Sequence, residues 1–219
     1  MTNGPVTEQD RWEENAGYST FTLAVEISAL LIAAEHAIYN NEPLLAEYLR
    51  ETADSWNASI ERWTYVTGSE LAKFVGVEGY YVRIGSKATN DSPETDLLTI
   101  SNRPQGENIC PANEMVSPDA LALVRFGLRS ASDPRILNTI KVIDATLKFD
   151  ATEGPVWYRY NRDGYGEKVD GSPFNGTGIG RPWPLLTGER AHYEVAAGNY
   201  AEAERLMKTM ENYATETGL

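Results

Sequence analysis

Two neighbouring glutamates stand beside a tryptophan in the segment Trp12-Glu13-Glu14-Asn15. Adjacent carboxylates repel each other, so burying both would raise the pKa of one of them. A glutamic acid that keeps its proton near neutral pH beside an indole is suited to act as the general acid of glycoside cleavage. The alternative is an acidic segment that precedes a helix and stabilises its N-terminal dipole. Composition alone favours this alternative, because glutamate is common before helices.

A second pair of chemical groups lies in an aromatic and glycine-rich segment. Arg159 and Asp163 are four residues apart, with tryptophan, tyrosine and glycine around them. The two side chains could form a fixed polar fork that hydrogen-bonds sugar hydroxyls, and the alternative is a surface ion pair in a tight turn. The density of aromatic residues and glycines favours a binding loop, because such loops commonly carry function.

Trp183 stands between two prolines at the start of an expected helix. It could offer a flat ring on which a pyranose stacks, or it could be a core tryptophan. Glu189 follows about two turns later on the same helix. A glutamate at such a place more often makes hydrogen bonds to solvent or to a neighbouring helix.

Several other chemistries have no support in the sequence. There is no Gly-x-Ser-x-Gly and no P-loop, which argues against an esterase and a P-loop nucleotide hydrolase. His36 and His192 lack the spacing of zinc ligands. Asp91, Glu94 and Asp96 could bind calcium, but a solvated acidic loop is the better interpretation. We therefore expect no metal site and no cofactor.

Composition narrows the class of partner. The 219 residues carry a formal net charge of −13, which argues against binding nucleic acid or an anionic membrane surface. The single cysteine, Cys110, excludes an internal disulfide framework. Five tryptophans and 12 tyrosines suit an uncharged, ring-shaped ligand such as a sugar.

The most apolar run, 23–38, is interrupted by charged residues and is expected to be too short to span a bilayer. The polar first residues predict no signal peptide, and the compartment stays open.

The periodicity of apolar residues predicts six helices in pairs, with short turns at one end and long loops at the other. Ser19 or Thr20 can cap the first helix, which is apolar on most of its circumference and is expected to pack on two sides. Two short β-type runs predict one hairpin with a long polar loop. The pattern is typical of helical hairpins in an α/α toroid, with function on the long-loop side. The expected helices cover 20–39, 43–66, 118–131, 134–148, 182–197 and 200–213, and the hairpin pairs 80–84 with 97–100.

Four segments, in the same order, resemble the bacterial glucoamylases and the related glucodextranases of the fifteenth family of glycoside hydrolases. The resemblance covers nearly the whole chain, and its last two segments are long and specific. The four segments are Asp10-Arg11-Trp12-Glu13-Glu14-Asn15-Ala16-Gly17-Tyr18, Ser101-Asn102-Arg103-Pro104, Arg159-Tyr160-Asn161-Arg162-Asp163-Gly164-Tyr165-Gly166 and Gly180-Arg181-Pro182-Trp183-Pro184-Leu185-Leu186-Thr187-Gly188-Glu189-Arg190.

The resemblance implies an inverting exo-hydrolase that releases β-glucose from the non-reducing ends of α-glucans, on an (α/α)6 barrel of twelve helices. It implies that Glu13 is the general acid. By the same resemblance Trp12 and Glu14 line its subsite, Arg159 and Asp163 hold the hydroxyls of the terminal glucose, and the ring of Trp183 lies beside the next sugar. One departure is Arg11, where many members carry leucine, and it either disturbs the first subsite or points outward. The substrate would be an α-glucan or a maltooligosaccharide, and comparing maltose with isomaltose would decide the linkage.

The resemblance also implies that the general base lies beyond Leu219, in a segment that relatives carry after the last helix. Glu167 and Glu189 are the substitutes that could be argued from this chain. We expect residues 1–219 to form one partial catalytic domain: the C-terminal portion of the barrel, about half of it, all-α apart from the hairpin. Its exposed apolar wall would meet a complementary barrel half or a second copy. The alternative is an inactive fragment, or a carbohydrate-binding or partner-binding remnant without catalysis.

Overall fold

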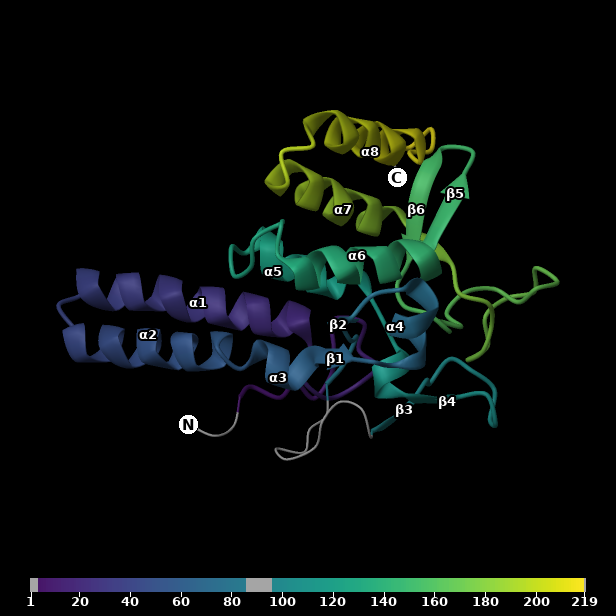
Figure 1. The fold of residues 1–219 in the computed structure, drawn as a ribbon. Helices are drawn as coiled ribbons and strands as arrows, with labels where there is room; N and C mark the ends of the chain where they lie inside the picture. The colour runs from purple at the N-terminus through teal and green to yellow at the C-terminus, as the bar shows by residue number, and fades with distance from the viewer. Residues whose placement is uncertain (1–3, 86–95, 219) are drawn as a thin grey trace.

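The computed structural model describes residues 4–85 and 96–218, and helices are the main regular structure (Figure 1). Helices α2, α1, α5, α7 and α8 are stacked in that spatial order, and α6 lies beside α5. The elements are α1 Thr20–Tyr39, α2 Pro43–Asn57, α3 Ile60–Thr64, β1 Tyr65–Thr67, α4 Glu70–Val75, β2 Gly79–Tyr81, β3 Leu97–Thr99, β4 Ile109–Pro111, the 3₁₀ turns η1 Ala112–Glu114 and η2 Pro118–Leu121, α5 Ala122–Arg125, α6 Pro134–Thr146, β5 Lys148–Ala151, β6 Gly154–Tyr158, β7 Pro182–Trp183, α7 Pro184–Ala196 and α8 Tyr200–Asn212.

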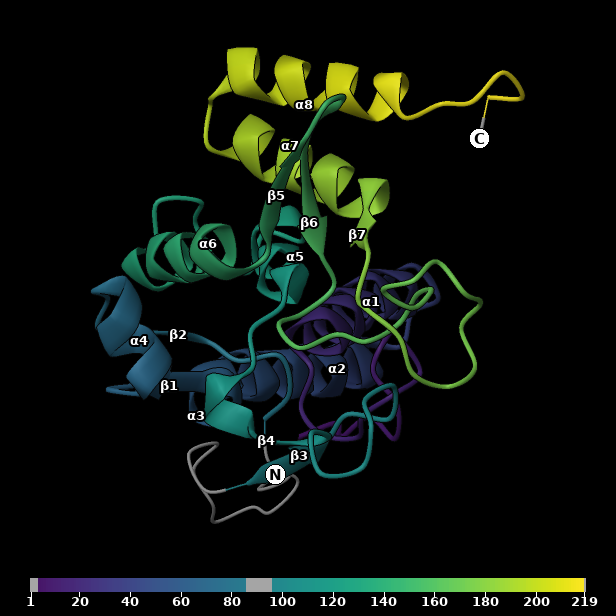
Figure 2. The same ribbon diagram turned by 90° about the vertical axis from the view of Figure 1, so that its right-hand side faces the viewer.

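The expected separation of short turns from long loops is confirmed. The turns that join α1 to α2, α5 to α6 and α7 to α8 all lie on the left in Figure 1. The long connections after β3 and after β6 lie on the opposite side. Figure 2, which faces that side, shows the loop after β6 beside the start of α1. Segments far apart in the sequence therefore meet at one end of the helices.

Helix α1 begins where the sequence predicts, because the side chain of Ser19 accepts a hydrogen bond from the backbone N–H of Thr22. Its expected packing on two sides is wrong, since Ile32 is 62% exposed and Ile38 is 45% exposed. The expectation that the apolar run is too short to span a membrane is also wrong. The helix has 20 residues and a mean hydropathy of 1.6, which is long and apolar enough by length and composition. Core helices and signal sequences meet the same criterion.

The second expected helix is interrupted. Helix α2 ends at Asn57, the short α3 follows, and Tyr65–Thr67 is the strand β1 rather than helix. The hydroxyl of Ser59 donates to the carbonyl of Ser55, a local bond that competes with helix continuation. The last residues then pair with β2, where a Cβ on Gly79 would come within 2.2 Å of the carbonyl oxygen of Val66. Glycine permits this close approach, so pairing replaces the last helical turn.

The expected hairpin between 80–84 and 97–100 is wrong. Strand β2 pairs antiparallel with β1, and β3 pairs antiparallel with β4, with Leu98 opposite Cys110. The connection 86–95, part of the expected hairpin loop, lies outside the described residues. A third sheet, β5-β6-β7, covers part of a segment that was expected to be irregular. Within the described residues the fold therefore has three small antiparallel sheets, and "all-α" is too simple a class.

The remaining helices follow their local signals. Helix α6 starts at Pro134 because the side chain of Asp133 caps it, accepting from the N–H of Arg135. Helices α7 and α8 form a hairpin close to the expected limits. The helix expected over 118–131 is much shorter, because Gly127 adopts a left-handed conformation with φ of 75° just after α5. Shortening this helix makes room for Arg129, which reaches across to Glu61.

Candidate active site

The loop that carries Trp12, Glu13 and Glu14 is folded around Asp10. The carboxylate of Asp10 accepts hydrogen bonds from the backbone N–H groups of Trp12 and Glu14, both at 3.1 Å. Its backbone carbonyl accepts from the N–H of Glu13 at 2.9 Å. Glu13 has φ of 60°, which is uncommon for a residue with a side chain and is often found at functional sites. The turn sends the side chains of Glu13 and Glu14 into different surroundings.

The carboxylate of Glu14 is saturated with donors. Its Oε1 accepts from Asn102 Nδ2 and Arg159 Nη2, both at 3.0 Å. Its Oε2 accepts from Arg83 Nη2 at 3.0 Å and from the hydroxyl of Tyr160. Two guanidinium groups therefore neutralise this carboxylate, and its side chain is only 10% exposed. Such a network of charge-assisted hydrogen bonds holds both oxygens of Glu14 in place.

Arg83 is the buried centre of this network, and the sequence analysis did not identify it. The residue is fully buried, and its guanidinium donates to Asp10 and Asn15 as well as to Glu14. It also stacks on the ring of Tyr160, 3.7 Å from the ring centroid. The available signal was a single arginine in the apolar run 80–84, because a buried charge needs partners.

The expected fork between Arg159 and Asp163 is confirmed. Nε and Nη2 of Arg159 each donate to the Asp163 carboxylate at 2.7 Å, and both residues are buried. Burial alone would lower the pKa of Arg159, but Asp163 outweighs this effect and raises it. Asn102 joins the same network by donating to Asp163 Oδ1 at 3.2 Å. The Asn102 Oδ1 accepts from the N–H of Gly164, so the two loops are held together.

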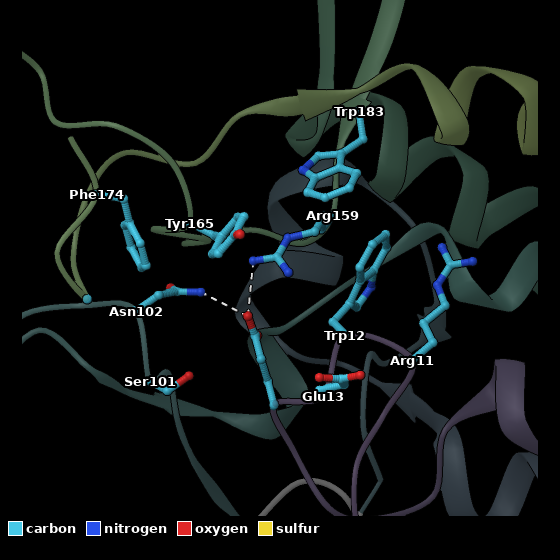
Figure 3. A pocket seen from close by; sticks show the side chains of 11 residues that line it. Arg11, Trp12, Glu13, Ser101, Asn102, Arg159, Tyr165, Phe174 and Trp183 are labelled. Carbon is cyan, nitrogen blue, oxygen red and sulfur yellow. Dashed lines mark hydrogen bonds and ion pairs between the residues drawn. The ribbon is translucent and has the colours of Figure 1, made fainter. Parts of the chain in front are cut away.

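These loops enclose one face of a cavity of about 610 Å³ (Figure 3). Trp12 and Trp183 meet edge to face with ring centroids 5.4 Å apart, and Tyr165 lies 6.3 Å from Trp183. Trp183 is half-buried at the start of α7 and lines the cavity instead of filling the core. The cavity is lined by Arg11, Trp12, Glu13, Glu14, Ser101, Asn102, Arg159, Tyr165, Phe174, Gly176 and Trp183.

The site residues that the sequence predicts all line this cavity except Asp163. Asp163 is buried and binds the guanidinium of Arg159. Sequence reasoning missed Ser101, Asn102, Tyr165 and Phe174 as lining residues.

Glu13 lies in the cavity wall and is exposed. The condition that both glutamates be buried is therefore not met, because the turn at Glu13 separates their side chains. Among the described residues no side chain pairs with the Glu13 carboxylate, in contrast to the four donors on Glu14. A carboxylate without such partners can contact a ligand in the cavity directly.

Arg11 does not point outward, so the second of the two alternatives given for this residue is excluded. Its guanidinium donates twice to Glu189, at 2.7 and 3.0 Å, and lies 2.8 Å from Asp119. Burial raises the pKa of Asp119, and the adjacent Arg11 opposes that effect. The other substitute for the base, Glu167, is exposed and pairs with Arg181 at 2.5 Å. Neither glutamate faces the cavity as a free carboxylate.

Among the described residues no group of three or more His, Cys, Asp or Glu side chains is arranged to hold a metal ion. Asp91 and Glu94, the residues considered for calcium, lie outside the described part of the chain. The polar groups at the cavity are instead arranged as hydrogen-bond donors and acceptors. Together with the aromatic rings, they form a site that suits a neutral molecule rich in hydroxyl groups.

Comparison with known proteins agrees with this chemistry. Residues 2–218 match the family described as Glycosyl hydrolases family 15. The chain is 44% identical over 217 residues to a glucoamylase of Clostridium sp. (strain G0005). The matched residues make up 99% of this chain and 29% of that protein. A crystal structure of a bacterial glucoamylase complexed with acarbose is similar, with a TM-score of 0.90 and 44% identity, over 99% of this chain and 31% of that one. The chain thus spans less than a third of the length of either relative.

Proposed function

Because this chain belongs to family 15 of the glycosyl hydrolases, we propose that it forms part of a glucoamylase-like enzyme that releases glucose from the non-reducing ends of α-glucans with inversion. The observation that carries this proposal is the contrast between two consecutive glutamates at one cavity. Glu13 is exposed and has no side-chain partner among the described residues, whereas Glu14 is fixed by four donors. Glycoside hydrolysis needs these two kinds of group, one that moves a proton and one that holds the sugar.

Glu13 is the general acid in this proposal. It gives its proton to the glycosidic oxygen as the bond between that oxygen and the anomeric carbon breaks. A sugar that enters the cavity displaces water from the exposed carboxyl group. The glycosidic oxygen of that sugar can then approach the Glu13 carboxyl group directly.

In this proposal Glu14 and Arg159 contact the terminal glucose, and Asp163 takes part by holding Arg159 in place. Glu14 and Asp163 hold the Arg159 guanidinium from two sides, so its remaining N–H groups have a fixed direction. The guanidinium carbon lies 5.1 Å from the Trp12 ring and 5.7 Å from the Trp183 ring. A pyranose can therefore stack on an indole while its hydroxyls meet a charged donor.

We propose that the general base comes from outside this chain. An inverting enzyme needs a second carboxylate about 6.5–9.5 Å from the acid, with room for a water molecule. The two glutamates considered as substitutes are committed to ion pairs, Glu189 with Arg11 and Glu167 with Arg181. Glu189 is held in a bidentate pair, Glu167 is exposed beside Arg181, and neither lines the cavity where the water would have to be activated.

The arrangement of the helices supports a proposal about the architecture of the domain. We propose that residues 1–219 form one partial catalytic domain, about half of an (α/α)6 barrel. Two observations support this: the paired helices, and an apolar wall on the protruding hairpin of α1 and α2, where several large apolar residues are more than 50% exposed. A complementary barrel half, or a second copy of this chain, would cover the wall. Its most exposed residues are Ile32, Tyr39, Leu44 and Tyr48.

A calorimetric titration with maltotriose, together with an assay for released glucose, tests this proposal. We expect saturable binding that is weakened in Arg159→Ala, retained in Glu13→Gln, and accompanied by little glucose. No binding would refute the substrate class. Glucose release that is lost in Glu13→Gln would support the acid but refute the assignment of the base to a segment outside the chain.

A second function, carbohydrate binding without catalysis, is favoured by one observation. The described residues offer Glu13 as the one unpaired carboxylate among those that line the cavity. A binding module needs no base and would keep the affinity of the cavity without any bond cleavage. The two functions differ in whether Glu13 ever transfers a proton, which product analysis decides.

A further inference from the structure

Arg11 lies against the face of Trp12, at the edge of the cavity. Its guanidinium carbon is 4.6 Å from the centroid of the Trp12 ring and 4.5 Å from that of Phe21. Figure 3 shows the Trp12 ring between the side chains of Arg11 and Arg159. The guanidinium carbon of Arg159 is 5.1 Å from the same ring. The indole is therefore held by two cations, each close enough for a cation–π interaction.

Both cations are anchored by carboxylates from other elements. Arg11 makes a bidentate pair with Glu189 of α7 and an ion pair with Asp119 of η2. The side chain of Asp119 is fully buried, and those of Arg11 and Glu189 are each 12% exposed. Arg159 is anchored separately, by Asp163 and Glu14. Through these two arginines, the position of Trp12 is tied to α7, to η2 and to the loop that follows β6.

We propose that Arg11 is a positioning residue that fixes the indole of Trp12 for sugar binding. Carboxylates hold its guanidinium on two sides, because both terminal nitrogens donate to Glu189 and Nε lies 2.8 Å from Asp119 Oδ1. Arg11 therefore acts through Trp12 rather than by holding sugar hydroxyls. This role rests on the proposed function, since it gives Trp12 the task of contacting the substrate.

The first test observes the ring itself, without any ligand. The five tryptophans can be replaced biosynthetically by 5-fluorotryptophan, and each ¹⁹F resonance assigned with a Trp→Phe variant. We expect Arg11→Leu to broaden the Trp12 resonance and to increase its H₂O/D₂O solvent shift, while the resonance of Trp56 in α2 stays unchanged. An unchanged line width and solvent shift for Trp12 would overturn the proposal.

Arg125→Leu is the matched control. Arg125 also approaches Glu189, at 3.6 Å, and the ring of Phe21, at 5.6 Å, but it does not stack on Trp12. We expect this variant to leave the Trp12 resonance as in the wild type, and an equal broadening would overturn the proposal. If Arg11→Leu fails to fold, Arg11→Lys keeps the charge beside Asp119 but cannot form the bidentate pair. We then expect a smaller broadening in the same direction, and its absence counts against the proposal.

The second test measures maltotriose affinity in a double-mutant cycle. We expect Arg11→Leu to weaken binding about 5-fold to 30-fold when Trp12 is present, and to have no further effect in Trp12→Ala. An equal loss in both backgrounds would show a merely structural role. If the wild type does not bind maltotriose, the proposed function fails, while the fluorine spectra still decide the role of Arg11.

Discussion

Glu13 and Glu14 are consecutive in the sequence, yet the structure places their carboxylates in opposite electrostatic surroundings. Within the part of the chain that the structure describes, Glu13 is exposed at the cavity with no side-chain partner. Glu14 is enclosed by two arginines, an asparagine and a tyrosine. The left-handed turn at Glu13, capped by Asp10, produces this difference. One short loop thereby supplies two carboxylates that can serve different chemical roles.

Exchanging each glutamate for glutamine is expected to have unequal effects. Glu14→Gln leaves Arg83 and Arg159 without a shared anion, so we expect a loss of about 3 kcal/mol in the free energy of unfolding. Glu13→Gln removes no such contact and should leave that free energy nearly unchanged. Urea denaturation of the two variants measures both values. Equal stability of the two variants would contradict the assignment of Glu14 to the buried network.

A methyl group at Gly164 is expected to displace Asn102, which lines the cavity. A Cβ at this position would lie 2.1 Å from the backbone oxygen of Asn102, so the two loops must separate in Gly164→Ala. Asn102 would then lose its hold on Glu14, and we expect maltotriose to bind at least about tenfold more weakly. Val169→Ala is a control in the same long loop, because the Val169 side chain is 86% exposed. Similar affinities in both variants would show that the loop contact is not needed.

Trp183 is expected to contribute through its aromatic face. Trp183→Ala removes the edge-to-face partner of Trp12 and should weaken maltotriose binding about tenfold, whereas Trp183→Phe should retain most of the affinity. Isothermal titration calorimetry measures both. If Trp183→Phe and Trp183→Ala weaken maltotriose binding equally, stacking is not the basis of recognition at this position.

Acid should destabilise the protein partly through Glu61. Burial alone would raise the pKa of Glu61, but hydrogen bonds from Arg129 and Tyr81 outweigh it and lower the pKa. The folded state therefore binds this proton less readily than the unfolded state, and the stabilisation is lost as pH falls from the ordinary glutamate pKa of about 4.3 towards the lowered value. Glu61→Gln should cost about 2 kcal/mol near neutral pH and progressively less in acid.

Urea denaturation across that pH range tests this expectation. Glu70→Gln is the control, because Glu70 is largely exposed where it pairs with Lys73. A constant difference between Glu61→Gln and the wild type at every pH would exclude the role of Glu61.

The sequence was most informative where structure depends on local signals. Ser19 and Asp133 cap α1 and α6, and proline opens α6 and α7, so the starts of these helices could be read from single residues. Residues 65–67 continue a helical pattern in the sequence, so local signals do not indicate that they form β1 and pair with β2. Burial likewise depends on the whole fold, so Ile32 of α1 is exposed despite its apolar surroundings in the sequence.

The site was predictable in its motifs but not in its connections. Arg159 and Asp163 are close in sequence, and their fork was expected. Arg83 binds Asp10 and Glu14 across about 70 residues, a distance that no local pattern spans. The separation of Glu13 from Glu14 depends on one backbone turn, which residue types alone do not indicate.

The central claim is that Glu13 donates a proton to a bound α-glucoside, and azide tests it most directly. Azide is a nucleophile that needs no general base, so it can attack the anomeric carbon from the β face. The bond to the leaving oxygen then breaks, and Glu13 supplies that oxygen with its proton. With maltose and azide we predict β-glucosyl azide by NMR in the wild type and in Glu70→Gln, and none in Glu13→Gln. Equal product in Glu13→Gln, or no product from bound maltose in the wild type, would contradict the claim.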